Sequence, residues 1–361
     1  MRRTLFSLPV AGLLAASPLA ACGGSASSAD DGLDVVAGFY PLAFAAEQIG
    51  GDRVEVNNLT PAGVEPHDLE LAPSDIAAIE EADFVVHLEG FIPALDEAVS
   101  QYASDSALEV SSAVDLIGYD DTEAFEGGHD EDEHADEHED HDDHADEDEH
   151  DDHDGEHEDH ADEDDHAEED DHADEDGDHG HDHDELDGTD PHFWLDPVRY
   201  AAVGEVIASE LSAIDADGDD DYTEGAAAFT EDLHELDEEL AQGLADRTDD
   251  DIVTSHAAFG YLADRYGLHQ VAISGLSPDQ EASSQRMAEI AEYVEEHGVT
   301  TIFFETLVSS DIADTVAAET GAETATLNPL EGLTADEVGE ADYFSIMRDN
   351  LAALQGALGS D

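Results

Sequence analysis

The chain has 361 residues and carries 98 acidic side chains against only 8 basic ones, all of them Arg, so its formal net charge at pH 7 is −90. Such a charge repels phosphate, which excludes a nucleic-acid partner. Apolar residues make up 40% of the chain, enough to form packed cores, so the chain is not disordered throughout. Its length accommodates two domains of ordinary size.

The amino-terminal stretch MRRTLFSLPVAGLLAASPLAAC has the pattern of a secretory signal peptide, which we expect over residues 1–21. Two Arg precede an apolar run that is shorter than the roughly 20 residues of a membrane-spanning helix. The run ends in LAAC, which resembles the lipobox of bacterial lipoproteins, so Cys22 is the expected lipidation site. The alternative is a free thiol, which would oxidise in an exported protein. Residues 22–32 have the composition of a flexible tether.

From residue 33 onward, short apolar runs alternate with stretches of helical periodicity. Strands are predicted over 33–39, 53–59, 83–88, 251–256, 269–274, 300–305 and 323–328, and helices over 40–51, 72–82, 258–267, 283–298, 310–321 and 343–358. Such alternation predicts parallel sheets covered by helices, here in two α/β lobes.

A long helix is predicted between the lobes, because Phe229, Leu233, Leu236, Leu240 and Leu244 recur every three or four residues. The expected division is an amino-terminal lobe over 33–220, a linker helix over 221–250 and a carboxyl-terminal lobe over 251–361. The alternative is an ordinary packing helix within one domain.

An insert over residues 125–188 consists almost entirely of Asp, Glu and His. Between His129 and Asp187 it holds 36 acidic residues and 14 His, which leaves 62 acidic residues elsewhere. The insert has too little apolar surface to fold by burial, so we expect a disordered loop whose imidazoles and carboxylates collect divalent cations. The alternative is a solvated insert, tolerated because long loops add little closure entropy. The acidity of the rest is typical of a protein kept soluble by charge repulsion in concentrated salt.

Four residues outside the insert are candidate metal ligands. His67 and His192 lie in loops punctuated by Pro, His256 ends a predicted strand, and Glu305 closes the apolar strand TTIFFE. Open α/β sheets hold ligands at the carboxyl ends of their strands, and a buried carboxylate requires a partner. Three neutral imidazoles and one carboxylate form a closed tetrahedral set that suits Zn²⁺.

The remaining histidines are expected to have structural or surface roles: His87 lies inside a strand, His234 in the linker helix, and His269 and His297 flank strand starts. Asp68 and Asp196 are expected to orient ligands or cap helices rather than bind metal.

The segments GVEPHDLELAPSD, DPHFWLDP, SHAAFGYLADRYGL and FFETLVSS resemble the ligand-bearing segments of the ZnuA-like (cluster A-I) zinc-binding lipoproteins of bacterial metal ABC transporters. The resemblance covers nearly the whole chain from Leu33, and the motifs occur in the family's order. It implies two (β/α) lobes joined by a rigid helix, with one Zn²⁺ in the cleft between them held by His67, His192, His256 and Glu305.

The same resemblance implies a monomer, anchored by lipid on the outer face of the cell membrane, that serves an ABC permease and its ATPase. Manganese-binding relatives typically place Glu where this chain has His256, so a transporter of manganese or another divalent metal is the first alternative. A zinc-dependent hydrolase is the second, although the chain contains no HExxH, GxSxG, P-loop or CxxC motif and is not expected to be an enzyme. An adhesin or a zinc buffer that works without a permease would share the site.

Overall fold

Two four-stranded parallel sheets form the framework of the molecule in a computed structural model that describes residues 32–118, 188–280 and 282–359. The signal peptide, Cys22, nearly all of the tether and nearly all of the acidic insert lie outside the described residues. The strand orders are β2-β1-β3-β4 and β6-β5-β7-β8, so each lobe has the same arrangement with its first strand inside the sheet. No helix among the described residues combines the length and apolar composition that crossing a membrane requires.

The amino-terminal lobe is built on the first sheet. Its strands are β1 (Leu33–Ala37), β2 (Val54–Asn58), β3 (Phe84–His87) and β4 (Ala107–Glu109), and its helices are α1 (Tyr40–Gly50), α2 (Pro73–Glu81) and α3 (Pro93–Tyr102), with short 3-10 turns η1 (Gly51–Arg53), η2 (Pro66–Asp68) and η3 (Ser111–Ala113). The strand β3 is buried at every position, as expected for an inner strand of a sheet covered on both faces.

The carboxyl-terminal lobe repeats this plan. Its strands are β5 (Asp251–Thr254), β6 (His269–Ala272), β7 (Thr301–Phe304) and β8 (Glu323–Thr326), and its helices are α7 (Gly260–Tyr266), α8 (Ser284–His297) and α9 (Asp311–Thr320). Gly267, Gly298 and Gly321 follow these three helices in the left-handed conformation that ends a helix most readily.

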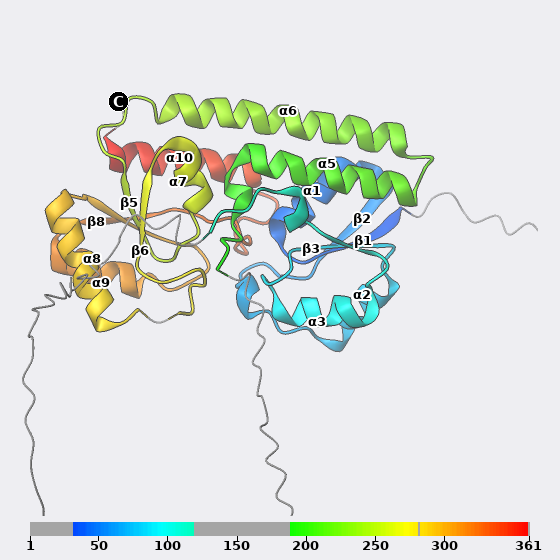
Figure 1. Cartoon of the computed structure of the whole chain (residues 1–361), viewed down its shortest axis with the longest axis horizontal. Helices are drawn as coiled ribbons and strands as arrows, with labels where there is room; N and C mark the ends of the chain where they lie inside the picture. Colours follow the sequence, from blue (N-terminus) through cyan, green and yellow to red (C-terminus); the bar gives the residue numbers. More distant parts are fainter. Residues whose placement is uncertain (1–31, 119–187, 281, 360–361) are drawn as a thin grey trace, which may run out of the picture.

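Three helices and a short turn connect the lobes: η4 (Phe193–Leu195), α5 (Pro197–Ile214), α6 (Asp219–Gly243) and α10 (Tyr343–Leu358). Figure 1 shows α6 running above both lobes, with α5 beneath it over the amino-terminal lobe and α10 beneath it over the other. At about 1.5 Å per residue, the 25 residues of α6 extend roughly 37 Å. Its periodic apolar residues, Leu233 and Leu236 among them, are fully buried, which confirms the predicted long helix.

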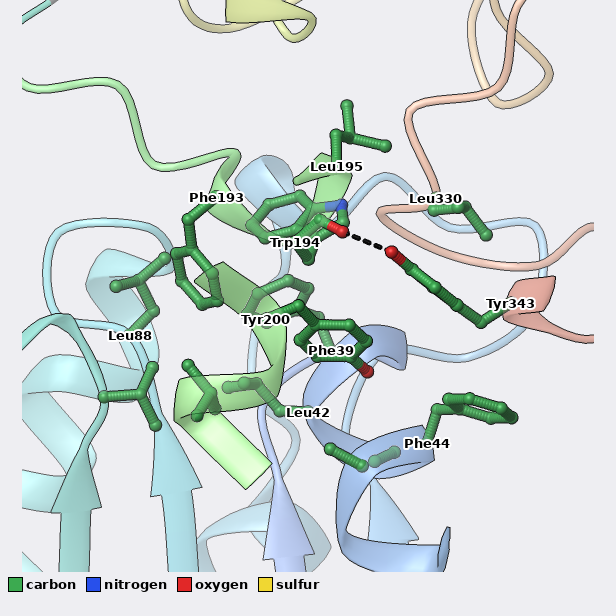
Figure 2. Close-up of a cluster of buried hydrophobic side chains, with 14 of the residues drawn as sticks. Phe39, Leu42, Phe44, Leu88, Phe193, Trp194, Leu195, Tyr200, Leu330 and Tyr343 are labelled. Carbon is green, nitrogen blue, oxygen red and sulfur yellow. Dashed lines mark hydrogen bonds between the residues drawn. The ribbon is translucent and has the colours of Figure 1, made fainter. Parts of the chain in front are cut away.

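The main core is continuous across the lobes. Figure 2 shows Trp194 and Tyr200 among the apolar side chains of both, with Tyr343 of α10 reaching toward them. The Tyr343 hydroxyl donates to the Trp194 carbonyl over 2.6 Å, and the indole N–H of Trp194 donates to the Pro329 carbonyl over 2.7 Å. The segment that precedes Glu331 is therefore fixed to η4, the turn that directly follows His192. We call His192 and η4, which lead from the first lobe into α5, the crossover.

The predicted α/β lobes are confirmed, and the predicted strands and helices within each lobe occur within a few residues of their expected limits. The long helix predicted over 221–250 ends earlier, at Gly243. Three elements were not predicted from the sequence: α3, the short edge strand β4 and α5. The helix α5 starts where Asp196 accepts hydrogen bonds from the N–H groups of Val198 and Arg199, so Asp196 is the cap that its sequence position indicated.

Candidate metal centre between the lobes

The candidate ligands meet at the carboxyl ends of the two sheets. His67 lies in η2 beyond β2, His256 lies two residues beyond β5, and His192 directly precedes η4. Glu331 lies in the coil between β8 and α10. Because parallel strands of one sheet end at one edge, loops distant in sequence meet there, as in other open α/β folds.

Glu331 is the centre of this group. From its Oε1 atom, Nε2 of His192 lies at 3.0 Å, Nε2 of His256 at 3.2 Å and Nε2 of His67 at 3.8 Å. One donor atom from each of His67, His192 and Glu331 lies within 4.8 Å of the others, the spacing of a set that could hold one metal ion. The structure thus brings together all three predicted histidines.

The group is buried except on one side. His192, His256 and Glu331 are at most 1% exposed, whereas the side chain of His67 is 14% exposed. His67 lines a cavity of about 430 Å³ whose walls come from both lobes, including Asp68 of one and Asp279 of the other. An ion would therefore approach past His67 and two carboxylates.

Three buried polar atoms in the group make no hydrogen bond within the described structure. They are Nε2 of His67, Nδ1 of His256 and Oε2 of Glu331, although Nδ1 of His256 lies 2.6 Å from Oε1 of Glu305. A buried polar atom without a partner costs roughly 1–3 kcal/mol, so unpaired polar atoms within a group of histidines and a carboxylate favour a bound ion.

Glu305 occupies a different position from the one expected. Its Oε1 atom lies 2.6 Å from Nδ1 of His256 and accepts a hydrogen bond from the backbone N–H of His256 over 3.2 Å. The expected partner of this buried carboxylate is therefore His256, and the other ring nitrogen of His256 faces Glu331. A carboxylate on the far nitrogen fixes the tautomer and orientation of a metal-binding imidazole.

His192 has an equivalent support. The carboxylate of Asp190 accepts hydrogen bonds from the backbone N–H of His192 over 2.9 Å and lies 2.8 Å from its Nδ1 atom. Both residues are fully buried. Nε2 of His192 is thereby directed at Glu331.

The charges of the group depend on one another. Burial lowers the pKa of His192 and of His256, but the facing carboxylates outweigh it, so the pKa of His192 is raised and that of His256 lies well above its usual value. Burial raises the pKa of Glu331, but the surrounding histidines hold it well below its usual range. Burial and then the Glu331 charge raise the pKa of Glu65 to about 9, so Glu65 is neutral at pH 7.

Glu331 is not among the ligands predicted from the sequence, although its position carries a signal. Glu331 lies in the segment NPLEGL, just after the predicted strand over 323–328. Glu305 has a similar position, because it is the last residue of the predicted strand TTIFFE. The placement of Glu331 depends on Leu330, which is buried and left-handed (φ 62°). The backbone N–H of Leu330 donates to Oδ1 of Asn328. Asn350 of α10 holds the backbone of Asn328, because its Oδ1 accepts from the Asn328 N–H and its Nδ2 donates to the Asn328 carbonyl. Such strain in a non-glycine residue persists where the surroundings impose it.

The other histidines lie away from the group. His87 is buried with Nδ1 3.3 Å from Asp96, and His269 and His297 both face Asp251 at the opposite edge of the second sheet. His234 lies on α6, as predicted.

Comparison with known proteins places the chain in a family. A model of the family described as zinc-uptake complex component A, periplasmic (ZnuA), matches residues 35–357. The chain is 35% identical to the high-affinity zinc uptake system protein ZnuA of Bacillus subtilis, over 94% of this chain and 93% of that protein. It is 36% identical to the zinc-binding lipoprotein AdcA of Streptococcus pneumoniae (strain ATCC BAA-255 / R6), over 93% of this chain and 58% of the relative.

Solved structures agree. The Zn(II)-bound ZnuA-like domain of S. pneumoniae AdcA is 31% identical and superposes with a TM-score of 0.63, covering 91% of this chain and 99% of that one. The family model, which matches residues 35–357, extends over both lobes and the segment that carries His192. The chain belongs to the family of zinc-uptake complex component A.

Proposed function

We propose that this protein captures one Zn²⁺ ion between its lobes with His67, His192, His256 and Glu331, and delivers it to the permease of an ABC transporter. The observation that carries the proposal is the convergence of three imidazole Nε2 atoms on one carboxylate oxygen. The set retains the three predicted histidines, with Glu331 as the fourth ligand and Glu305 as the group that orients His256.

The distances support this set. Bonds of about 2.0–2.1 Å to a tetrahedral zinc ion place ligand atoms roughly 3.3 Å apart. The observed separations from Glu331 Oε1 are 3.0, 3.2 and 3.8 Å, which bracket that value. Oε1 of Glu331 therefore lies near the ligand-to-ligand spacing of a zinc site from each of the three Nε2 atoms.

The donor types favour zinc transport over the alternatives. Three imidazoles form a softer set than two imidazoles and two carboxylates, which favours zinc over manganese. A zinc hydrolase keeps one coordination position open for water. Here Glu331 occupies the fourth position, and the buried group leaves only the His67 side facing a cavity.

Delivery follows from the origin of the ligands. The amino-terminal lobe and the crossover supply His67 and His192, and the carboxyl-terminal lobe supplies His256 and Glu331. Separation of the lobes would dismantle the site, so docking of a monomer on the permease, with the ATPase as energy source, would release the ion. The B. subtilis relative carries the name of a zinc uptake system protein.

Membrane attachment through Cys22 completes the proposal. Diacylation of this residue would hold the protein on the outer face of the cell membrane, because two acyl chains anchor a protein stably. In a Cys22→Ser variant, we expect the protein to be released or left uncleaved; unchanged membrane association would contradict the proposal.

The acidic insert is proposed to collect metal for the buried site. Titration of the metal-free protein with Zn²⁺, with and without residues 129–187, tests both parts. We expect one tight site in both proteins and additional weak sites only in the intact one. If removal of the insert abolished the tight site, the ligands of that site would lie in the insert and not between the lobes.

A further inference from the structure

Tyr261 connects the lobes beside the candidate metal centre. It lies on α7, five residues after His256, and is fully buried. Its hydroxyl donates to the carbonyl of Asp190 over 2.7 Å and accepts from the backbone N–H of Ile117 over 3.0 Å. Ile117 and Asp190 lie in two segments on the amino-terminal side of the lobe boundary, and Tyr261 lies on the other side. One hydroxyl therefore holds both segments against the carboxyl-terminal lobe.

The two segments are also paired with each other. The backbone N–H of Asp190 donates to the Ile117 carbonyl over 3.0 Å, and Gly118 and Thr189 form an antiparallel bridge next to them. The Tyr261 hydroxyl therefore positions a two-segment unit and not a single loop.

The ring of Tyr261 is itself held in place. The guanidinium of Arg199 lies 5.1 Å from the ring centroid, a cation–π distance, and is held by Asp196 and Asp264. Burial raises the pKa of Tyr261, so its hydroxyl stays protonated and donates to Asp190 at any pH of interest.

Asp190 carries this link on to a proposed ligand. Its carbonyl accepts from Tyr261, while its carboxylate accepts from the backbone N–H of His192 and faces Nδ1 of the same residue. We infer that Tyr261 is a positioning residue that sets His192 against His256 across the lobe boundary, and so determines zinc affinity without touching the ion. The inference rests on the proposed function, because it takes both histidines as zinc ligands.

The test is Tyr261→Phe, which removes only the hydroxyl. Groups that orient metal ligands typically contribute 10- to 100-fold in affinity. We expect zinc affinity to fall about 10-fold or more, measured by competition with a chelator, and the d–d bands of the Co²⁺-loaded protein to change because the His192 donor shifts.

Tyr200→Phe is the matched control. Tyr200 is also fully buried, and its hydroxyl donates to the Pro41 carbonyl in the core of the amino-terminal lobe. The Tyr200→Phe variant therefore measures the effect of losing a buried hydroxyl that does not support a proposed metal ligand. We expect comparable losses of thermal stability in the two metal-free variants, with zinc affinity reduced only in Tyr261→Phe. Unchanged affinity and unchanged Co²⁺ spectra in Tyr261→Phe would overturn the inference.

A second variant tests the route through Asp190. Asp190→Asn keeps the carbonyl that accepts from Tyr261 but weakens the support of His192, so its loss of affinity and that of Tyr261→Phe should be less than additive. Strict additivity would overturn the proposed route. Failure of the proposed function looks different: the unaltered protein would then lack a tight zinc site, or Glu331→Gln would leave that site intact.

Discussion

Two groups of histidines in the described chain face a carboxylate, and they differ in burial. Around Glu331, two of the three histidines and the carboxylate itself are buried. Around Asp251, Nδ1 of His269 lies at 3.4 Å and Nδ1 of His297 at 3.0 Å from the two carboxylate oxygens, but their side chains are 63% and 45% exposed. The second group lies in an acidic hollow of the carboxyl-terminal lobe.

This difference separates a candidate ligand set from a solvated surface. Water satisfies exposed imidazoles and screens their charges, so such pairs contribute little to stability and remain free to move. In the buried group, His192 and His256 have no such solvent, and their Nδ1 atoms lie against Asp190 and Glu305. Histidines and carboxylates are therefore held in fixed positions around Glu331, whereas those around Asp251 are free to move.

The strongest test of this comparison removes the central charge from the buried group. Glu331→Gln should lower zinc affinity by at least about 100-fold, because a proposed ligand is lost, whereas loss of an orienting group costs roughly 10- to 100-fold. Chelator competition on protein that lacks residues 129–187 measures this without background from the insert. Glu305→Gln is the control. A larger loss in the control would make Glu305 the ligand.

A swap of one ligand tests the choice of metal. His256→Glu gives two imidazoles and two carboxylates, a harder set, so zinc affinity should fall by more than manganese affinity. The loss for zinc should be roughly 10- to 100-fold or more. Zn²⁺ and Mn²⁺ are titrated in parallel on the protein without the insert. If zinc affinity did not change, His256 would be a structural residue at a strand end.

A smaller effect follows from protonation. The raised pKa values of His192 and His256 mean that these residues stabilise the metal-free fold fully below about pH 6.5, their unfolded value, and that this contribution is lost as pH rises through the raised pKa values. Zinc binds the neutral imidazoles, so binding near pH 7 should release about one proton or more, and apparent affinity should fall as pH falls.

Calorimetry in two buffers with different protonation enthalpies measures this release. Equal binding enthalpies in both buffers would mean that the buried histidines are already neutral in the metal-free protein. His256→Glu should release fewer protons, because a histidine with a raised pKa is gone.

The smallest effect is expected at the exposed group. His269→Gln should change the free energy of unfolding by less than about 0.5 kcal/mol, because exposed ion pairs contribute little. Zinc affinity of the tight site should stay within about twofold, since distant sites act independently. Urea unfolding and chelator competition measure the two quantities. A large loss of zinc affinity at the tight site in His269→Gln would contradict the prediction that the exposed group around Asp251 does not contribute to that site.

Local pattern predicted the fold well. The helix α6 was recognised because its apolar residues recur at helical spacing, and that spacing forms a stripe in any straight helix. The edge strand β4 has only three residues, and none is fully buried, so it carried too little pattern to be detected. The helix α5 was missed although Asp196 and Pro197 mark its start.

The sequence by itself predicted the two lobes and the long helix, which the structure confirms, and it predicted three of the four proposed ligands, because helical periodicity and short motifs are local properties. Only the tertiary structure distinguished Glu331 from Glu305, since both are buried acidic residues that follow a strand of the second sheet. The left-handed Leu330 and its neighbours direct Glu331 at the three Nε2 atoms, whereas Glu305 meets the opposite side of the His256 ring. The physical reason is that side-chain direction at a lobe boundary depends on contacts between segments more than a hundred residues apart, such as Trp194 with Pro329.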